Sequence, residues 1–178
     1  MKIGRVTLSD RASSGIYQDL SGPEIERVLR EQFAEEIEFA RVLLPDDRAQ
    51  IEAALRGLCA QNCALVLTTG GTGPSQRDVT PEATRAVLEK ELPGFGEAMR
   101  AASFAKVPTA ILSRATAGVR GQTLIVNLPG NPRAIAECLP ILMPAIAEAI
   151  DHLTGLRPKL KSPPPFGRLD KAIQPKYI

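Results

Sequence analysis

The first 69 residues alternate between short strand-like segments and longer helix-like segments, and this order limits the fold more than any other feature. Residues 2–8, 37–44 and 63–69 are rich in apolar and β-branched side chains, whereas residues 22–33 and 47–60 repeat apolar side chains at helical spacing. Segment 63–69 has almost no polar interruption, as expected for a strand buried on both faces of a parallel sheet. The order predicts an α/β fold with helices on both faces of a mostly parallel central sheet.

The second half of the chain continues the same pattern. Two helices are expected at residues 80–90 and 94–105, and residues 115–119 and 122–128 could form a hairpin or two separate sheet strands. A long apolar helix follows Asn131; it contains Pro140 and Pro144, which could kink it, and it should end at Gly155.

Chain length limits the number of domains. With 178 residues, 44% of them hydrophobic, the chain can bury one sizeable core and is short for two ordinary domains. We expect one domain over residues 1–155. Residues 156–178 are rich in Pro and Lys and lack periodicity, so we expect a C-terminal tail that wraps a surface or is partly mobile.

Composition argues against several classes of function. A formal charge of +2, 4% aromatic residues and no Trp give little basis for nucleic-acid binding, although a small anionic ligand remains open. No apolar run approaches the roughly 20 residues that span a bilayer, and the N-terminus does not resemble a signal peptide. We therefore expect a cytoplasmic protein that binds neither nucleic acid nor a membrane.

Cysteine and histidine residues do not suggest a metal centre or a nucleophile. Cys59, Cys63 and Cys138 lack paired spacing, and His152 is the single histidine. We interpret the cysteines as small buried thiols and His152 as a surface or packing residue, since no partner for nucleophilic catalysis is evident.

A Gly/Thr cluster, TTGGTG at residues 68–73, follows the buried strand at the edge where open parallel sheets bind ligands. Glycines allow close backbone approach and positive φ, and successive N–H groups can surround a phosphate. The alternative is a tight turn without a ligand. The spacing matches neither a Walker A loop, which needs a Lys after the last Gly, nor a dinucleotide-binding fingerprint.

Acidic side chains follow the ends of two predicted strands. Asp47 has capping-box spacing to Gln50, which leaves Asp46 without an evident structural role, and Asp78 lies five residues beyond Gly73. Carboxylates from neighbouring strand-end loops suit Mg²⁺, which takes one or two carboxylates together with water and phosphate oxygens. The first such loop, Ser9 to Asp19, is either a polar wall of the same crevice or a solvated loop.

Helix starts offer structural interpretations for nearby polar residues. Ser21 with Glu24 has capping-box spacing, and Thr80 followed by Pro81 reads as an N-cap and first helical residue. In NLPGNP, residues 127–132, Asn131 is a plausible N-cap, but this explains neither Asn127 nor Gly130. N–H groups at that helix start could hold an anion or a heterocycle edge.

Six motifs in this order resemble one family. SDRASSG, LLPDD, TTGGTGPSQRDVTPEAT, PGFGEAMR, LSRATAG and NLPGNPRAI, spread over residues 3–153, are similar to the molybdopterin adenylyltransferases of MogA/MoaB type, and to the corresponding domains of gephyrin and plant Cnx proteins. The resemblance implies a three-layer α/β/α sandwich, a homotrimer, and Mg²⁺-dependent transfer of AMP from ATP to the terminal phosphate of molybdopterin, releasing pyrophosphate. It also implies a MoeA-type molybdate insertase as the downstream partner.

The resemblance also implies roles for individual residues. Asp46 and Asp78 would be the catalytic, metal-associated carboxylates. The ligand-binding residues would be Ser9, Asp10, Thr69, Gly70, Gly71, Thr72, Gly73, Ser113, Asn127, Pro129 and Gly130. The arginine that contacts phosphate stays open among Arg11, Arg77, Arg114 and Arg120.

Two other functions compete with this one. A non-catalytic molybdopterin-binding or scaffold protein of the same family is the alternative, although two acids near a dianionic phosphate favour an enzyme. A nicotinamide-dependent oxidoreductase disagrees with the motif spacing. Transfer of a nucleotidyl group needs positioning and charge neutralisation more than a protein nucleophile, so the absence of a suitable Cys or His is no objection.

Overall fold

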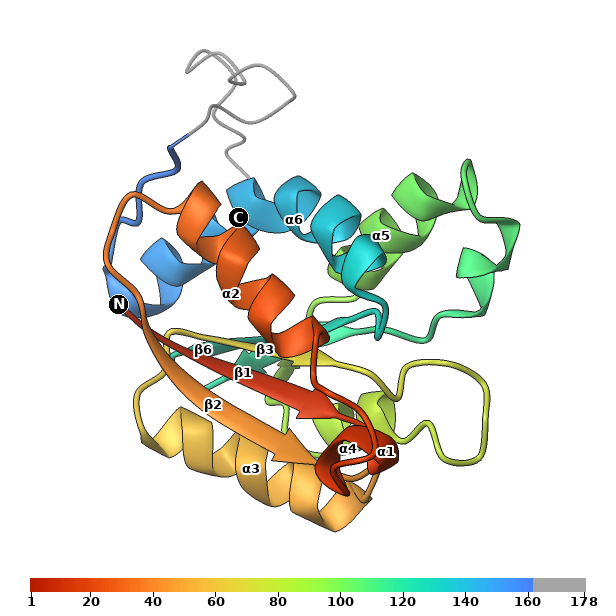
Figure 1. Ribbon diagram of the computed structural model, residues 1–178. Coiled ribbons are helices and arrows are strands. Elements are labelled where there is room, and N and C mark those ends of the chain that lie inside the picture. Colours follow the sequence, from red (N-terminus) through yellow and green to blue (C-terminus); the bar gives the residue numbers. More distant parts are fainter. Residues whose placement is uncertain (162–178) are drawn as a thin grey trace.

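A computed structural model describes residues 1–161, which form a central sheet covered by helices on both faces (Figure 1). The strands are β1 (Lys2–Leu8), β2 (Glu38–Leu44), β3 (Leu65–Thr69), β4 (Lys90–Glu91), β5 (Ala117–Arg120) and β6 (Thr123–Leu128). The helices are α1 (Asp10–Ser13), α2 (Ser21–Gln32), α3 (Arg48–Ala60), α4 (Thr80–Arg85), α5 (Gly94–Phe104), the 3₁₀ helix η1 (Pro108–Leu112) and α6 (Pro132–Thr154).

The six strands are ordered β2-β1-β3-β6-β5-β4. Strands β2, β1, β3 and β6 are mutually parallel, whereas β5 runs antiparallel to both of its neighbours and forms a hairpin with β6. Helices α2, α5 and α6 cover one face of the sheet, and α3 and α4 cover the other (Figure 1). The predicted three-layer α/β/α fold with a mostly parallel sheet is confirmed.

Each face of the sheet contributes to its own hydrophobic core. Ile25 and Leu29 of α2 pack with Leu139 and Met143 of α6 in the larger core, while the smaller core includes Ile51 of α3. All five residues of β3 are buried, as its uninterrupted apolar pattern predicted. The sheet is therefore packed against a helix layer on each face, and the strand ends lie between these two layers.

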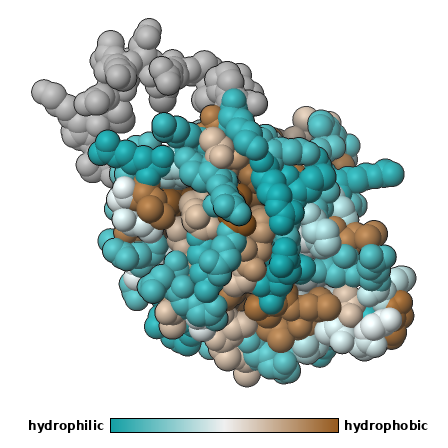
Figure 2. Space-filling view, turned by 60° about the vertical axis from the view of Figure 1, so that its left-hand side comes forward, coloured by the Kyte–Doolittle hydropathy of each residue, from teal (hydrophilic) through white to brown (hydrophobic). Residues whose placement is uncertain are grey.

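Strand β2 forms one edge of the sheet and is partly exposed, with Leu43 at 40% exposure. The guanidinium of Arg41 donates hydrogen bonds to the buried carboxylate of Glu26 on α2, with both distances 2.7 Å. Figure 2 shows hydrophilic side chains over most of this side of the molecule, with apolar patches between them. Charged side chains on an edge strand discourage pairing with another strand.

Several predicted helix ends are confirmed. The Asp47 side chain accepts a hydrogen bond from the Gln50 N–H, and the Asn131 side chain accepts one from the Arg133 N–H. Helix α6 continues past both of its internal prolines and ends at Gly155, whose φ is 72°.

Two cap predictions are wrong, and both errors lie beside the Gly-rich loop. Ser21 does not cap α2; its hydroxyl donates to the Gly130 carbonyl at 2.8 Å. Thr80 does not cap α4, because its hydroxyl donates to the Gly70 carbonyl at 2.8 Å. Both hydroxyls join a helix start to a carbonyl of another loop, a long-range role that local sequence does not reveal. Helix α4 also ends at Arg85, before the expected residue 90.

The first part of the predicted tail lies against the end of α2. Ala34 N–H donates to the Lys159 carbonyl at 2.9 Å, and Lys161 N–H donates to the Gln32 carbonyl at 2.7 Å. Residues 162–178 lie outside the described residues, so the division at residue 155 stays a prediction. Among the helices of residues 1–161, none is long and apolar enough to cross a membrane.

Candidate ligand site at the carboxyl edge of the sheet

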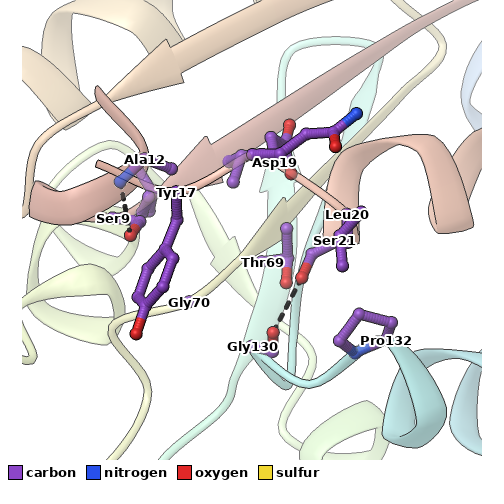
Figure 3. Close-up of a pocket in the computed structure, with 13 residues that line it drawn as sticks. Ser9, Ala12, Tyr17, Asp19, Leu20, Ser21, Thr69, Gly70, Gly130 and Pro132 are labelled. Carbon is purple, nitrogen blue, oxygen red and sulfur yellow. Dashed lines mark hydrogen bonds between the residues drawn. The ribbon is translucent and has the colours of Figure 1, made fainter. Parts of the chain in front are cut away.

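A cavity of about 380 Å³ opens between the carboxyl ends of β1 and β3 (Figure 3). These two strands are neighbours, but the chain leaves β1 toward β2 and leaves β3 toward the other half of the sheet. Such a point, where connections diverge, is where open α/β sheets bind ligands. The cavity therefore lies where the fold predicts a ligand.

Loops from three parts of the chain line this first cavity. Thr69 and Gly70 come from the end of β3, Ser9 follows β1, and Gly130 precedes α6. The N-termini of α2 and α6 both open onto it, and helix N-termini favour anions through their dipoles and free N–H groups. An anionic ligand thus suits the cavity.

Two hydroxyl groups fix the shape of the cavity. Besides the Ser21 bond to Gly130, Thr69 donates to the Pro129 carbonyl at 2.7 Å. Both bonds hold the loop before α6 against other elements, and Figure 3 shows the first of them crossing one side of the cavity. The cavity is therefore held open by hydrogen bonds and not by packing alone.

The glycines of the Gly/Thr cluster are required by the loop itself. Gly70 and Gly71 have φ of +99° and +61°, which side chains other than glycine rarely adopt. A Cβ at Gly70 would contact the Leu8 carbonyl, and a Cβ at Gly71 would contact the Thr80 hydroxyl. A tight turn therefore accounts for these two glycines, and a ligand needs support from other groups.

Asp10 and Asp46 clamp the loops after β1 and β2 together. Asp46 N–H donates to Asp10 Oδ1 at 3.0 Å, and Asp10 N–H donates to Asp46 Oδ2 at 3.2 Å. The other oxygen, Asp46 Oδ1, is buried without a hydrogen-bond partner. A Cβ built at Gly71 would lie 3.0 Å from it, so this oxygen lies directly beside the Gly-rich loop.

Burial is the main cause that raises the pKa of Asp46, and the charges of Asp10 and Asp78 raise it further. Asp78 is the smallest of these causes, and it lies on the loop that follows the Gly/Thr cluster. Its Oδ2 accepts the Ser75 N–H at 2.9 Å, and a Cβ at Gly73 would lie 2.9 Å from the same oxygen. An unpartnered carboxylate oxygen among acids of adjoining loops fits a hard cation such as Mg²⁺.

Two arginines act on this acidic cluster. Arg77 donates to both oxygens of Asp10 and lowers the pKa of that carboxyl group. Arg114 donates to the carbonyls of Gly73 and Asp78, at 2.8 and 2.6 Å, and pairs with Glu82. Arg114 thus fixes the loop that carries Asp78, whereas the sequence had marked it only as one of four candidate phosphate contacts.

A second cavity of about 270 Å³ lies on the other side of the loop before α6. Ser113 and Pro129 line this second cavity, whereas Thr69, Gly70 and Gly130 line the first. Its other walls include apolar side chains of α5, η1 and α6. Six of the eleven predicted ligand-binding residues are therefore distributed over two adjoining cavities, and the other five line neither: Asp10, Gly71, Thr72, Gly73 and Asn127.

Asn127 and Thr72 lie beneath the surface. Asn127 is fully buried, and its amide donates to the hydroxyls of Thr68 and Thr84, both at 2.9 Å. It joins β6 to β3 and α4 and supports the following loop from below. Thr72 is 8% exposed and lines neither cavity.

Several residues that line the first cavity were not among the predicted ligand-binding residues, and Tyr17 and Asp19 are two of them. Asp19 Oδ2 accepts hydrogen bonds from Arg5 and Thr7 of β1, at 2.7 and 2.8 Å, and Oδ1 accepts the Gly22 N–H. In the sequence both residues belong to the polar loop after β1. Two interpretations of that loop were equally open: a wall of the cavity or a solvated loop.

Fold and site together define a class: an α/β protein with a polar, anion-compatible site at the switch point of its sheet. Residues 4–148 match the family described as probable molybdopterin binding domain, and the chain belongs to that family. The resemblance inferred from six motifs is confirmed at the level of the family.

Two relatives named molybdopterin adenylyltransferase are about half identical to this chain over the matched residues. The molybdopterin adenylyltransferase of Helicobacter pylori strain J99 is 52% identical over 154 residues, 86% of this chain and 88% of the relative. The Escherichia coli K12 enzyme of the same name is 50% identical over 85% of this chain and 78% of its own length. The molybdopterin biosynthesis enzyme MoaB of Thermus thermophilus has a TM-score of 0.79 at 41% identity, covering 87% of this chain and 97% of that one.

Proposed function

We propose that this protein is a molybdopterin adenylyltransferase, which transfers AMP from ATP to the terminal phosphate of molybdopterin and releases pyrophosphate. The observation that carries the proposal is the buried, unpartnered Asp46 Oδ1 beside the Gly-rich loop, in a chain about half identical to enzymes of that name. A carboxylate oxygen left without a partner in the folded protein calls for a ligand.

Two adjoining cavities suit a reaction between two substrates. A terminal phosphate oxygen of molybdopterin attacks the α-phosphorus of ATP, a new P–O bond forms, and the bond to pyrophosphate breaks with its electron pair. The loop of residues 129–131 separates the cavities, so substrates on its two sides would lie close to each other. Holding two reactants in this way supplies much of the catalysis.

The protein's own groups act on charge and position. The helix N-termini at the first cavity stabilise phosphate charge, and Arg114 holds Asp78 in place through its backbone carbonyl. Asp46 and Asp78 would hold Mg²⁺. When bound, this cation neutralises charge on the phosphate oxygens during transfer. Residues 1–161 contain no group of three or more side chains arranged to hold a metal, so phosphate oxygens and water would complete its coordination.

We further propose a cytoplasmic homotrimer that passes its product to a MoeA-type insertase. Support for self-association comes from four apolar side chains on α5, η1 and their connection, each more than half exposed: Phe104, Val107, Ile111 and Leu112. Exposed apolar side chains that gather in one place favour an interface. Light scattering at micromolar concentration tests the trimer, and a monomer would contradict it.

The decisive experiment combines ATP, Mg²⁺ and molybdopterin with the purified protein, and chromatography follows the AMP adduct and pyrophosphate. We expect both products in equal amounts, and neither when Mg²⁺ is chelated. Binding of molybdopterin without an adduct would instead identify the non-catalytic alternative.

A further inference from the structure

The four candidate phosphate-contacting arginines differ in their positions and in their contacts. Arg114 is fixed by bonds to the loop 73–78 and to α4. Arg120 lies at the opposite edge of the sheet and donates to a backbone carbonyl there. Arg11 lies over the ring of Tyr17, 4.6 Å from its centroid. Arg114 and Arg120 are thus tied to backbone carbonyls, and the partner of Arg11 is an aromatic ring and not a carboxylate.

Arg77 has a different environment. Its Nη2 donates to Asp10 Oδ1 at 2.7 Å and its Nε donates to Oδ2 at 3.1 Å. The Arg77 side chain is 65% exposed and that of Asp10 is 44% exposed. Both side chains are thus open to a ligand, and the planar fork of a guanidinium fits a phosphate as well as a carboxylate. A polyphosphate that offers the same fork geometry can therefore take the place of the Asp10 carboxylate.

Departure of Arg77 would leave the Asp10 carboxylate in place. Backbone hydrogen bonds in both directions still hold Asp10 against Asp46, at 3.0 and 3.2 Å. Asp46 also has its buried oxygen without a partner. Two adjacent carboxylates without a counter-charge repel each other and attract a divalent cation.

We propose that Arg77 is an exchangeable phosphate ligand: it leaves Asp10 for the polyphosphate of the substrate and thereby makes the Asp10 carboxylate available to a cation beside Asp46. The identity of the polyphosphate as ATP or pyrophosphate rests on the proposed function. The exchange makes anion and cation binding favour each other, because each removes a charge that opposes the other. Arg77 is then the phosphate-contacting arginine that the sequence left open.

The test uses inorganic pyrophosphate and Mn²⁺, each alone and together, on the full chain. Arg77→Met should weaken pyrophosphate binding by about tenfold or more in calorimetry, because a charge-assisted fork is lost. The same variant should bind Mn²⁺ alone more tightly in electron paramagnetic resonance titrations, because Asp10 has lost its partner. Arg77→Lys keeps the charge without the fork and should lie between the two proteins in pyrophosphate affinity.

Arg27→Met is the matched control, since Arg27 is 50% exposed and pairs with Glu24 and Glu31 on α2. It should change neither titration. In the double variant Asp10→Asn/Arg77→Met, the gain in Mn²⁺ affinity should disappear.

Three outcomes separate the claims. Equal pyrophosphate affinity in Arg77→Met and Arg27→Met would overturn the exchange. Weaker pyrophosphate binding without tighter Mn²⁺ binding would overturn the release of Asp10. Because neither titration needs ATP or molybdopterin, failure of AMP transfer alone would count against the proposed function and leave the exchange standing.

Discussion

The two edges of the sheet both carry cavities, but their polar groups are used differently. The cavity at the amino edge is larger, about 610 Å³ against 380 Å³ at the carboxyl edge. Its arginines, Arg56 and Arg120, donate to the carbonyls of Ala86 and Val87 just beyond α4. At the carboxyl edge, by contrast, Asp46 Oδ1 is buried without a partner.

The difference indicates that a buried polar atom without a hydrogen-bond partner marks a candidate site better than the volume of a cavity does. Folding stability is served when every buried polar group is paired, so an unpaired carboxylate oxygen points to a role beyond folding. Parallel strands also place helix N-termini at the carboxyl edge and helix C-termini at the amino edge, which favours anions at the first. Matched substitutions at the two edges can test this contrast.

The largest contrast is expected between Asp78→Asn and Glu89→Gln. Each carboxylate accepts a backbone N–H, from Ser75 and from Gly121 respectively, at opposite edges of the sheet. Asp78→Asn should lower turnover by about 10²-fold or more, because a charge at the cation site is lost, while molybdopterin binding survives. Glu89→Gln should leave turnover within about twofold. Steady-state kinetics and calorimetry on both variants check this, and wild-type turnover in Asp78→Asn would refute the metal-site assignment.

Glycines with positive φ at the two edges provide the second contrast. Gly71 and Gly121 have φ of +61° and +55°, but a Cβ at Gly121 would meet nothing within 4 Å, whereas one at Gly71 would meet the Thr80 hydroxyl and Asp46 Oδ1. Valine at Gly121 should cost about 1–2 kcal/mol of stability from backbone strain. Valine at Gly71 adds roughly 1–3 kcal/mol from overpacking and should weaken ligand binding.

Urea denaturation gives the stability of both variants, and calorimetry gives molybdopterin affinity for those that fold. Normal binding by a folded Gly71→Val protein would mean that the Gly-rich loop is only a turn.

The sequence predicted the layers of the fold better than the site. Periodicity and buried strands set the order of elements, because hydrophobic burial is encoded locally in patterns such as 63–69. The caps at Asp47 and Asn131 were also local and were predicted correctly. Ser21 and Thr80 were misassigned because their hydroxyls bond to Gly130 and Gly70, and only the folded chain brings those carbonyls near.

Asn127 illustrates a second limit. Its motif marks it as a candidate, and the fold places its amide between two buried threonine hydroxyls, where it supports the site without lining either cavity. Sequence motifs identify residues that a site depends on, but they do not separate contact from support. The predicted ligand and metal roles remain predictions for the variants to test.

Two buried threonines, one at each edge of the sheet, allow a closer comparison of the two edges. Thr69 donates to the Pro129 carbonyl and Thr123 donates to the Cys63 carbonyl, both at 2.7 Å. Replacing either by Val, which has nearly the same shape, should cost about 1 kcal/mol of unfolding free energy. Only Thr69→Val should also lower ligand affinity, by a few fold, since it loosens the wall of the first cavity. Equal affinity losses in both variants would show that general stability, and not the position of the loop, controls binding.

The smallest stability effect is expected at Asp46, and its sign is unusual. The pKa of Asp46 is raised in the folded protein, so folding favours its protonated form. This contribution is present below the ordinary pKa of Asp and is lost as pH rises through the folded pKa. At neutral pH the charged Asp46 therefore opposes folding.

Asp46→Asn should accordingly stabilise the fold at neutral pH, by less than about 1 kcal/mol because Asp46 as a whole is only partly buried. The gain should vanish at acidic pH, where the folded protein already protonates Asp46, while turnover falls at every pH. The neighbouring Asp47 provides the control, because Asp47→Ala removes the cap of α3 and should cost about 1 kcal/mol with turnover preserved. Denaturation midpoints measured across pH for both variants decide the matter. A destabilised Asp46→Asn protein would mean that Asp46 stabilises the fold, and that its unpartnered oxygen is no sign of a ligand.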